Sequence, residues 1–475
     1  MDKYKRLASN TILFAVSQFS SKLLSLFLTG FYLRTLGDER YGLMTSFISL
    51  VSILFPLVSL SAVDATTRFA LDADRDKQSV FTTGLAIAGS GYLVFVLASP
   101  LLRGFFDLPG YNWLVCVYMF TSILRLICCH FVRSLLHTKL FAVDGIVTTL
   151  TLIGFNVLYL GVLGMGVEGY MLAVISSDFL SAASLFLIAR LWQYFSIRRA
   201  KWDTAKTMLR YSLPLMLSNS SWWLLNAGST VLIPLITSSY VDNSVYGVAQ
   251  KIPHLMTILV NIFAESWQLS AVLDGQNEEK QSFFSQVYTA LAFISSVAGA
   301  GLILFGQIVL YLLTLGAGYS AAWPLIPLLI LSGVFSCLSS FLNSIYLVEK
   351  KTTPILVTLG VGTAVNLAGN LLLIPVIGLY GAAFAGLFSS VLIFIMRLID
   401  TRRFVKLQYS VPLFAASLLL LAAQAVIASL QLPYWHWCCA AMLAAMLLLN
   451  FATLKKLWLF FADKFLGRLF KRSNG

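Results

Sequence analysis

Residues 10–33 read NTILFAVSQFSSKLLSLFLTGFYL, and Lys22 is the one charged side chain in this run. A bilayer core about 30 Å thick needs roughly 20 apolar residues in a helix. The run is therefore long enough to cross a membrane, and it is too long for the apolar part of a cleavable signal peptide. We expect it to form a first transmembrane helix that stays in the protein.

Thirteen further apolar runs of similar length fill the rest of the chain. Hydrophobic residues make up 59% of the sequence and charged residues 11%, with a mean hydropathy of +0.84. These values leave no room for a separate soluble domain. They predict an all-α fold, a polytopic membrane protein with about 14 transmembrane helices. The predicted spans are 10–34, 41–63, 81–100, 112–132, 141–164, 168–190, 211–237, 245–269, 285–313, 323–347, 354–375, 379–399, 411–431 and 434–454.

Positive charge gathers in every second gap between the spans. These gaps hold 27 of the 33 Lys and Arg residues, whereas the opposite gaps hold Arg34, Arg40 and Arg103. Short cytoplasmic loops are enriched in Lys and Arg, so we expect both termini to lie in the cytoplasm. The net charge of +13 then indicates anionic lipid headgroups as partners, and not nucleic acid.

The longest basic gap divides two halves that resemble each other. Tyr41-Gly42 opens the second span and Tyr246-Gly247 opens the eighth, and the sixth and twelfth spans open with similar glycine pairs. Such a parallel repeat is typical of transporters that rock one half against the other. The predicted divisions are a six-helix lobe at 1–190, a basic linker at 191–210, a second six-helix lobe at 211–400, an additional helix pair at 411–454 and a basic tail at 455–475.

The loops show no sign of a catalytic domain. All predicted outer loops are short, and the sequence contains no glycine-rich nucleotide-binding loop. Its four histidines are scattered without the spacing of a zinc site. We therefore expect no enzyme activity, no catalytic or metal-binding residue and no cofactor, with H⁺ or Na⁺ left open as a coupling ion.

Ionisable residues inside the spans are the candidate functional residues, because charge in a bilayer usually faces a cavity or a partner. Lys22 lies about 12 residues, or roughly 18 Å, from either end of its span. With Arg125 and Lys251 it gives a positive excess that suits an anionic substrate, since these side chains pair well with phosphate. Asp178 and Glu265 are candidates for ion coupling. A structural Lys22–Asp178 ion pair, snorkelling of Arg125 and Lys251, and solvation of Glu265 are the simpler alternatives.

The seventh span is polar along one side, and its candidates for contact with a glycan are Asn219, Trp222 and Asn226. A hydrated wall of this kind suits a sugar substrate. Hydrogen bonds between helices are the alternative explanation for the same residues.

Several short motifs resemble one transporter family. They are Asn10-Thr11, Ser21-Lys22-Leu23, the run RTLGDERYG at 34–42, Tyr211-Ser212-Leu213-Pro214, and the run YGVAQK at 246–251. This pattern resembles the Wzx-type oligosaccharide flippases, or polysaccharide exporters, of the MOP superfamily.

The resemblance implies a MATE-like fold of two six-helix lobes around a central cleft lined by Lys22 and Lys251. It implies a flippase that moves undecaprenyl-pyrophosphate-linked oligosaccharide across the cell membrane by alternating access, for O-antigen, capsule or exopolysaccharide. The expected partners are the lipid-linked oligosaccharide, membrane lipids and the glycan polymerase machinery. A lipid II flippase, a cation-coupled multidrug antiporter and a glycan polymerase or ligase stay open as alternatives.

Overall fold

The computed structural model describes residues 2–72, 74–100, 112–256, 280–349, 351 and 353–455, with side chains from residue 28 onward except at 280, 283 and 347. Within these ranges the chain is helical, with short connections and no strand. Ten of the described helices are long and apolar enough to cross a membrane, and one further apolar helix is shorter. The predicted all-α, polytopic membrane fold is confirmed.

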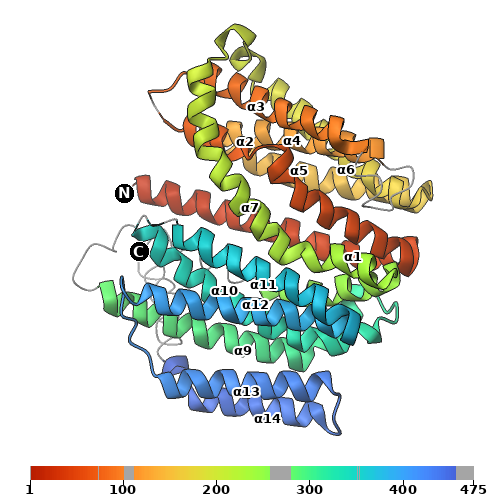
Figure 1. Cartoon of the computed structure of the whole chain (residues 1–475), viewed down its shortest axis with the longest axis vertical. Coiled ribbons are helices and arrows are strands. Elements are labelled where there is room, and N and C mark those ends of the chain that lie inside the picture. Colours follow the sequence, from red (N-terminus) through yellow and green to blue (C-terminus); the bar gives the residue numbers. More distant parts are fainter. Residues whose placement is uncertain are drawn as a thin grey trace, which may run out of the picture. The chain divides into compact units, whose positions relative to one another are not determined.

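The chain forms two compact units, and the first is Met1–Ser244 (Figure 1). Short connections separate its helices, including a π-helical turn at Val157–Val162 and 3₁₀ turns at Leu191–Tyr194 and Ile197–Arg199. The helices are α1 (Asp2–Val58), α2 (Ala62–Ala70), α3 (Lys77–Ala98), α4 (Asn112–Ser134), α5 (Thr138–Asn156), α6 (Gly166–Ile188) and α7 (Trp202–Thr237).

The second predicted span does not end where the sequence indicates. Span 10–34 and the first part of span 41–63 lie in α1, which is interrupted at Gly37, in the predicted gap between them, where φ is +73° and the backbone is not helical. The second span then stops at Val58, because Leu60 and Ser61 adopt positive φ before α2 begins. A further difference is that α7 begins at Trp202 and not at residue 211.

Small and aromatic side chains pack the core of the first unit. α4 packs against α6 and α2, and the rings of Phe81 and Phe131 lie 4.4 Å apart between α3 and α4. A Cβ added at Gly84 would meet the Thr66 side chain on α2, and one at Gly91 would meet the backbone oxygen of Val58. Glycine therefore lets α3 approach its neighbours closely, as small residues do in membrane helix pairs.

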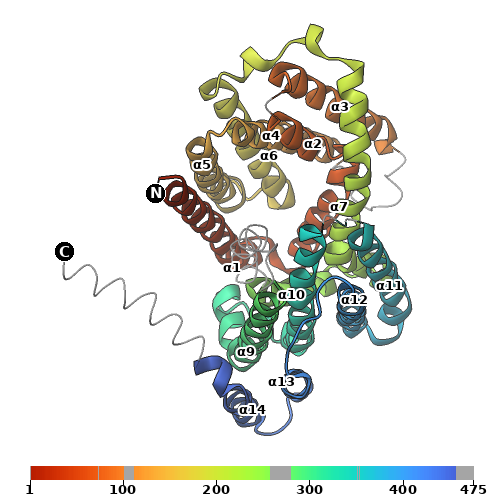
Figure 2. The same cartoon turned by 90° about the vertical axis from the view of Figure 1, so that its left-hand side faces the viewer.

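The second unit is Val245–Gly475. Figure 2 shows α11 beside α12 and α13 beside α14, and the helices of each pair are in contact. The described helices are α9 (Lys280–Thr314), α10 (Ile326–Val348), α11 (Thr353–Ile377), α12 (Leu379–Thr401), α13 (Val411–Ser429) and α14 (Trp435–Leu449), with a 3₁₀ turn at Ser320–Leu325 and a helix over 240–256. The predicted lobes, which divide at the linker 191–210, stay a prediction.

One glycine fixes the hairpin between α11 and α12. Gly378 turns the chain with φ +59°, and α12 follows directly. A Cβ at Gly381 would meet the backbone of Leu373 and Ile374 on α11, whereas a Cβ at Gly386 on the same helix would meet nothing within 4 Å. The two helices are thus in backbone contact at Gly381.

We predict that Gly381→Ala destabilises the protein, because the added methyl collides with a backbone that cannot move aside. Overpacking of this kind costs about 1–3 kcal/mol. The melting temperature of the purified protein in detergent should fall by several degrees. Gly386→Ala is the matched control and should leave it unchanged or higher, since Ala favours a helix over Gly by roughly 0.5–1 kcal/mol. Equal melting temperatures for the two variants would contradict this packing.

Candidate functional site

A charged cluster lies between α4 and α6 inside the first unit. Arg125 on α4 is 3.5 Å from the carboxylate of Asp178 on α6, and its Nε donates to Ser181 at 3.3 Å. Ser122 donates to the second oxygen of Asp178. Asp178 is 6% exposed, so the ion pair is largely shielded from solvent. Arg125 and Asp178, which the sequence treats as separate candidates, therefore belong to one site.

A second carboxylate, that of Asp144 on α5, joins this cluster. Ser181 donates to its Oδ1 at 2.6 Å, and Thr148 lies 3.5 Å from the same oxygen. Oδ2 of Asp144 has no hydrogen-bond partner among the described residues, although the side chain is 6% exposed. The sequence interpretation omits Asp144, and its position inside the predicted span 141–164 is the signal that identifies it.

Among the side chains that the structure describes, the cluster has two carboxylates and one guanidinium. The guanidinium of Arg125 pairs with Asp178 and is linked to the second carboxylate, Asp144, through the Ser181 hydroxyl. An uncompensated charge in a low-dielectric interior is unfavourable by several kcal/mol in order of magnitude. One bound proton or one monovalent cation would make the cluster neutral, and the free Oδ2 of Asp144 gives such an ion an acceptor. The arrangement is therefore suited to an ion-dependent equilibrium.

Of the other predicted charges, Lys251 is not in this cluster. Lys251 is half-buried on the helix over 240–256 and belongs to the second unit. The side chain of Lys22 and the whole of Glu265 lie outside the described residues.

A polar seam joins α1 to α7 and to the first residues of the helix over 240–256, all within the first unit. Asn243 is fully buried and donates to the Gly42 carbonyl at 2.9 Å and to Ser46 at 2.7 Å. The hydroxyls of Ser49 and Thr230 are 2.8 Å apart. A Cβ at Gly42 would overlap the carbonyl of Tyr240, so the two backbones touch there. The seam lies at the end of the helices where the sequence has few basic residues.

The seam continues toward the basic end of the helices. Asn219 on α7 donates to Asp64 at 2.9 Å and to Ser61 at 3.3 Å. The ring of Phe69 on α2 lies edge-on against Tyr211, with centroids 5.8 Å apart. Asn219, a candidate for glycan contact, is therefore engaged in contact between helices.

The other two candidates for glycan contact, Trp222 and Asn226, are exposed on the surface of the first unit. Trp222 is 49% exposed and packs edge-on against Trp223, with 4.9 Å between ring centroids. Asn226 is exposed and donates to the backbone oxygen of Trp222 at 2.7 Å. These two residues present surface on one side of α7.

The second unit contains a buried arginine. Arg397 is one of the 27 basic residues assigned to the cytoplasmic gaps, although the predicted span 379–399 also includes it, and it lies inside α12 and is 7% exposed. Its guanidinium donates to Thr358 at 3.1 Å and to the Ser339 carbonyl at 3.0 Å. α12 continues to Thr401, so the last predicted turn of span 379–399 is still packed against α10 and α11.

One contact recurs in the two units at similar spacing. Ser122 bonds Asp178 in the first unit, and Ser332 lies 2.9 Å from Ser390 in the second, at positions shifted by 210 and 212 residues. Phe335 stands 210 residues after Arg125. The repeat is therefore visible in side-chain contacts, but the charged pair of the first unit is replaced by Phe335 and a serine in the second.

The sequence matches a family model described as polysaccharide biosynthesis protein over residues 33–324. The chain belongs to this family. No curated protein matches the sequence. The membership confirms the resemblance to polysaccharide exporters that the sequence motifs indicate.

Solved structures of the MOP superfamily share the fold. A lipid II flippase, MurJ, in an inward closed conformation matches with a TM-score of 0.67 and 14% identity, covering 97% of this chain and 100% of that chain. The MATE multidrug transporter DinF-BH in complex with R6G matches with a TM-score of 0.57 and 18% identity, covering 84% and 95%. A mutant form of the Vibrio cholerae MATE transporter VcmN gives 0.55 and 14%, covering 83% and 98%. The predicted MATE-like fold is confirmed.

We predict that Arg125→Gln lowers the stability of the folded protein, because it leaves Asp178 buried without its cation. Breaking a buried pair from one side costs about 3–5 kcal/mol. The double variant Arg125→Gln/Asp178→Asn should recover most of the loss, since the two effects are coupled. The measurement is the melting temperature of each purified variant.

Arg68→Gln serves as the control for this cycle. It breaks the Arg68–Asp72 ion pair of 2.7 Å, in which both side chains are exposed, and such pairs contribute about 0–1 kcal/mol. A double variant as unstable as the sum of its single variants would show that Arg125 and Asp178 act independently, contrary to the geometry.

Proposed function

We propose that this chain is a flippase that translocates an oligosaccharide linked to undecaprenyl pyrophosphate from the cytoplasmic to the outer leaflet of the bacterial inner membrane. The product would feed the synthesis of a surface polysaccharide. The observation that carries the proposal is the family match over residues 33–324 in a chain whose fold is that of flippases and transporters. In this proposal both termini and the basic loops are cytoplasmic, and no chemical step occurs.

The polar seam supplies a physical basis for alternating access. Its contacts between Ser49 and Thr230 and from Asn243 to Gly42 are neutral hydrogen bonds, each contributing about 0.5–1.5 kcal/mol net. Contacts of that strength hold a closed state and still break when another state binds the substrate more tightly. We propose that the seam closes the outer side of the transport path and opens to release the glycan.

The charged cluster is our candidate for ion coupling. An H⁺ or Na⁺ that neutralises the excess charge of Asp144 and Asp178 would favour whichever state keeps the cluster buried. An ion gradient would then bias the transport cycle. Lys22 and Lys251 stay predicted contacts of the pyrophosphate, with Trp222 and Asn226 as predicted contacts of the sugars.

Two related functions compete with this proposal. MurJ is a lipid II flippase, and the same fold in this chain makes lipid II a candidate substrate. DinF-BH is a multidrug transporter, and the buried carboxylates of this chain would also suit a cation-coupled antiporter. Membership in a polysaccharide biosynthesis family favours an oligosaccharide over both.

We predict that cells without the gene accumulate lipid-linked oligosaccharide in the cytoplasmic leaflet and lose the surface polymer. The two quantities are measured by lipid extraction with mass spectrometry and by gel analysis of surface glycan. A plasmid copy should restore both, and a plasmid copy of Asp144→Asn should restore the surface polymer less completely if the cluster drives coupling.

Other outcomes would contradict the proposal in distinguishable ways. Accumulation of lipid II with a loss of cell-wall synthesis would identify the cell-wall precursor as the substrate. Unchanged glycan with increased drug sensitivity would identify an antiporter.

A further inference from the structure

The segment between α6 and α7 is fixed to the first unit by hydrogen bonds. Gln78, at the start of α3, donates to the Gln193 carbonyl at 2.8 Å, and Thr82 donates to the Tyr194 carbonyl at 3.2 Å. The backbone N–H of Ser196 in turn donates to the Thr82 hydroxyl at 3.0 Å. The segment is therefore an ordered part of the unit's surface and not a loose connection.

Buried contacts under the segment hold its orientation. Leu191 is fully buried, and the ring of Tyr194 lies edge-on against Phe131 on α4, with 5.4 Å between centroids. Because Leu191 and Tyr194 are directed into the unit, the residues next to them in the sequence are directed outward. The segment thus has one face on the protein and a second, exposed face, on which Trp192 lies at the edge, 6.2 Å from the Phe186 ring of α6 between ring centroids.

The outward face is rich in large apolar side chains. Four of them lie between residues 192 and 202, and two are among the most exposed large apolar residues of the described chain. They are Trp192 at 45%, Phe195 at 46%, Ile197 at 77% and Trp202 at 76% exposure. Trp and other aromatic residues gather where hydrocarbon meets the polar headgroups, because their rings are amphipathic. Exposure of this kind beside a transmembrane helix indicates contact with the bilayer interface.

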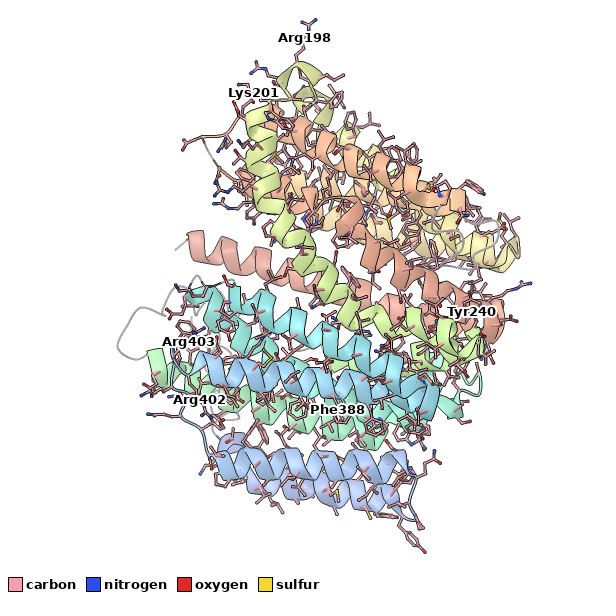
Figure 3. The ribbon with its side chains drawn as sticks, viewed as in Figure 1. Arg198, Lys201, Tyr240, Phe388, Arg402 and Arg403 are labelled. Atoms are coloured by element: carbon pink, nitrogen blue, oxygen red, sulfur yellow. The ribbon has the colours of Figure 1, made fainter. Side chains whose placement is uncertain are left out.

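Positive charge is interleaved with these apolar side chains. Residues 190–210 contain more basic residues than acidic ones, and the acidic residue among them is Asp203. Figure 3 shows Arg198 and Lys201 extending away from the ribbon at this end of the unit. Arg199 is 3.4 Å from Asp76 at the start of α3, in a pair whose side chains are both exposed. The face therefore carries a local excess of positive charge.

We propose that residues 190–202 form a binding surface for anionic phospholipid headgroups. Arg198, Arg199 and Lys201 would contact the phosphates, and Trp192 and Trp202 would insert at the boundary between headgroups and acyl chains. Because α6 is long and apolar enough to cross the membrane and ends directly before this segment, the interface lies within reach of these side chains. The attachment would keep the segment at the membrane surface together with α3 during transport.

The test compares phosphatidylglycerol with phosphatidylcholine of the same acyl chains in nanodiscs that contain the full chain. Native mass spectrometry counts the lipids retained by the protein. The variant Arg198→Gln/Arg199→Gln/Lys201→Gln should reduce the preference for phosphatidylglycerol at least about tenfold, because each basic residue near an anionic surface is worth about fivefold in affinity. High salt should reduce the preference of the parent protein in the same direction.

A matched variant in the second unit separates this surface from general positive charge. Arg402→Gln/Arg403→Gln/Lys406→Gln removes the same charge, but Arg403 is already paired with Asp400 at 2.7 Å. Figure 3 shows Arg402 and Arg403 beside the end of α12. This variant should keep most of the preference for phosphatidylglycerol. Equal loss in both triple variants, or no loss in the first, would overturn the proposal.

A second measurement stays informative if the first triple variant fails to fold. Trp192→Ser/Trp202→Ser leaves every charge in place, and its tryptophan fluorescence is recorded with lipids that carry a quencher near the headgroup. The fraction of tryptophan fluorescence lost to this quencher should be smaller in the double variant than in the parent protein. Trp437→Ser, at an exposed site on α14, is the control. An unchanged response in the double variant would show that the two side chains do not reach the interface.

Discussion

Neutralising charge away from water is the constraint on which the first unit depends. Placing an Asp or Arg at the centre of a bilayer helix costs about 2.5–3.5 kcal/mol even by insertion scales. Arg125 and Asp178 lower that cost by pairing, and hydroxyls of neighbouring helices satisfy the remaining oxygens and donors. Asp144 is compensated least, since one of its oxygens has no partner among the described residues. Helices α4, α5 and α6 must therefore pack together for the cluster to exist, and an ion that completes it acts on all three.

Helices at corresponding positions of the two units are held together by different side chains: an ion pair with serine in the first unit and serine hydroxyls alone in the second. In the second unit the position of Asp178 is taken by Ser390, which lies near the hydroxyls of Ser332 and Ser336 and needs no counter-charge. The buried cation there, Arg397, binds a hydroxyl and a carbonyl and no carboxylate among the described residues. A repeat that began as two similar halves would retain its serine contacts because they hold helices together. The charged pair distinguishes the first unit and is the site at which we propose ion coupling.

Helix length and apolar runs are enough to predict the fold, because a bilayer imposes them on any chain that crosses it. Backbone turns within or between the helices are harder to predict from hydropathy. The predicted gap at 35–40 contains the break at Gly37, but the turn at Ser61 depends on a positive φ that hydropathy does not register. The partners of buried side chains are harder still to predict. The sequence makes Asp178 a candidate, but its pairing with Arg125 depends on how α4 packs against α6. Hydropathy includes Arg397 in the predicted span 379–399, but it does not show which groups the buried guanidinium contacts.

The measurement that tests the account most directly is transfer of lipid-linked oligosaccharide in reconstituted vesicles with the seam locked. Cysteines at Ser49 and Thr230, whose hydroxyls are 2.8 Å apart, should form a disulfide that stops transfer until a reductant is added. A cysteine pair at Thr151 and Ser177, 3.0 Å apart on α5 and α6, should leave transfer intact, since those helices move together. Transfer that continues at full rate with the seam disulfide formed would contradict the account.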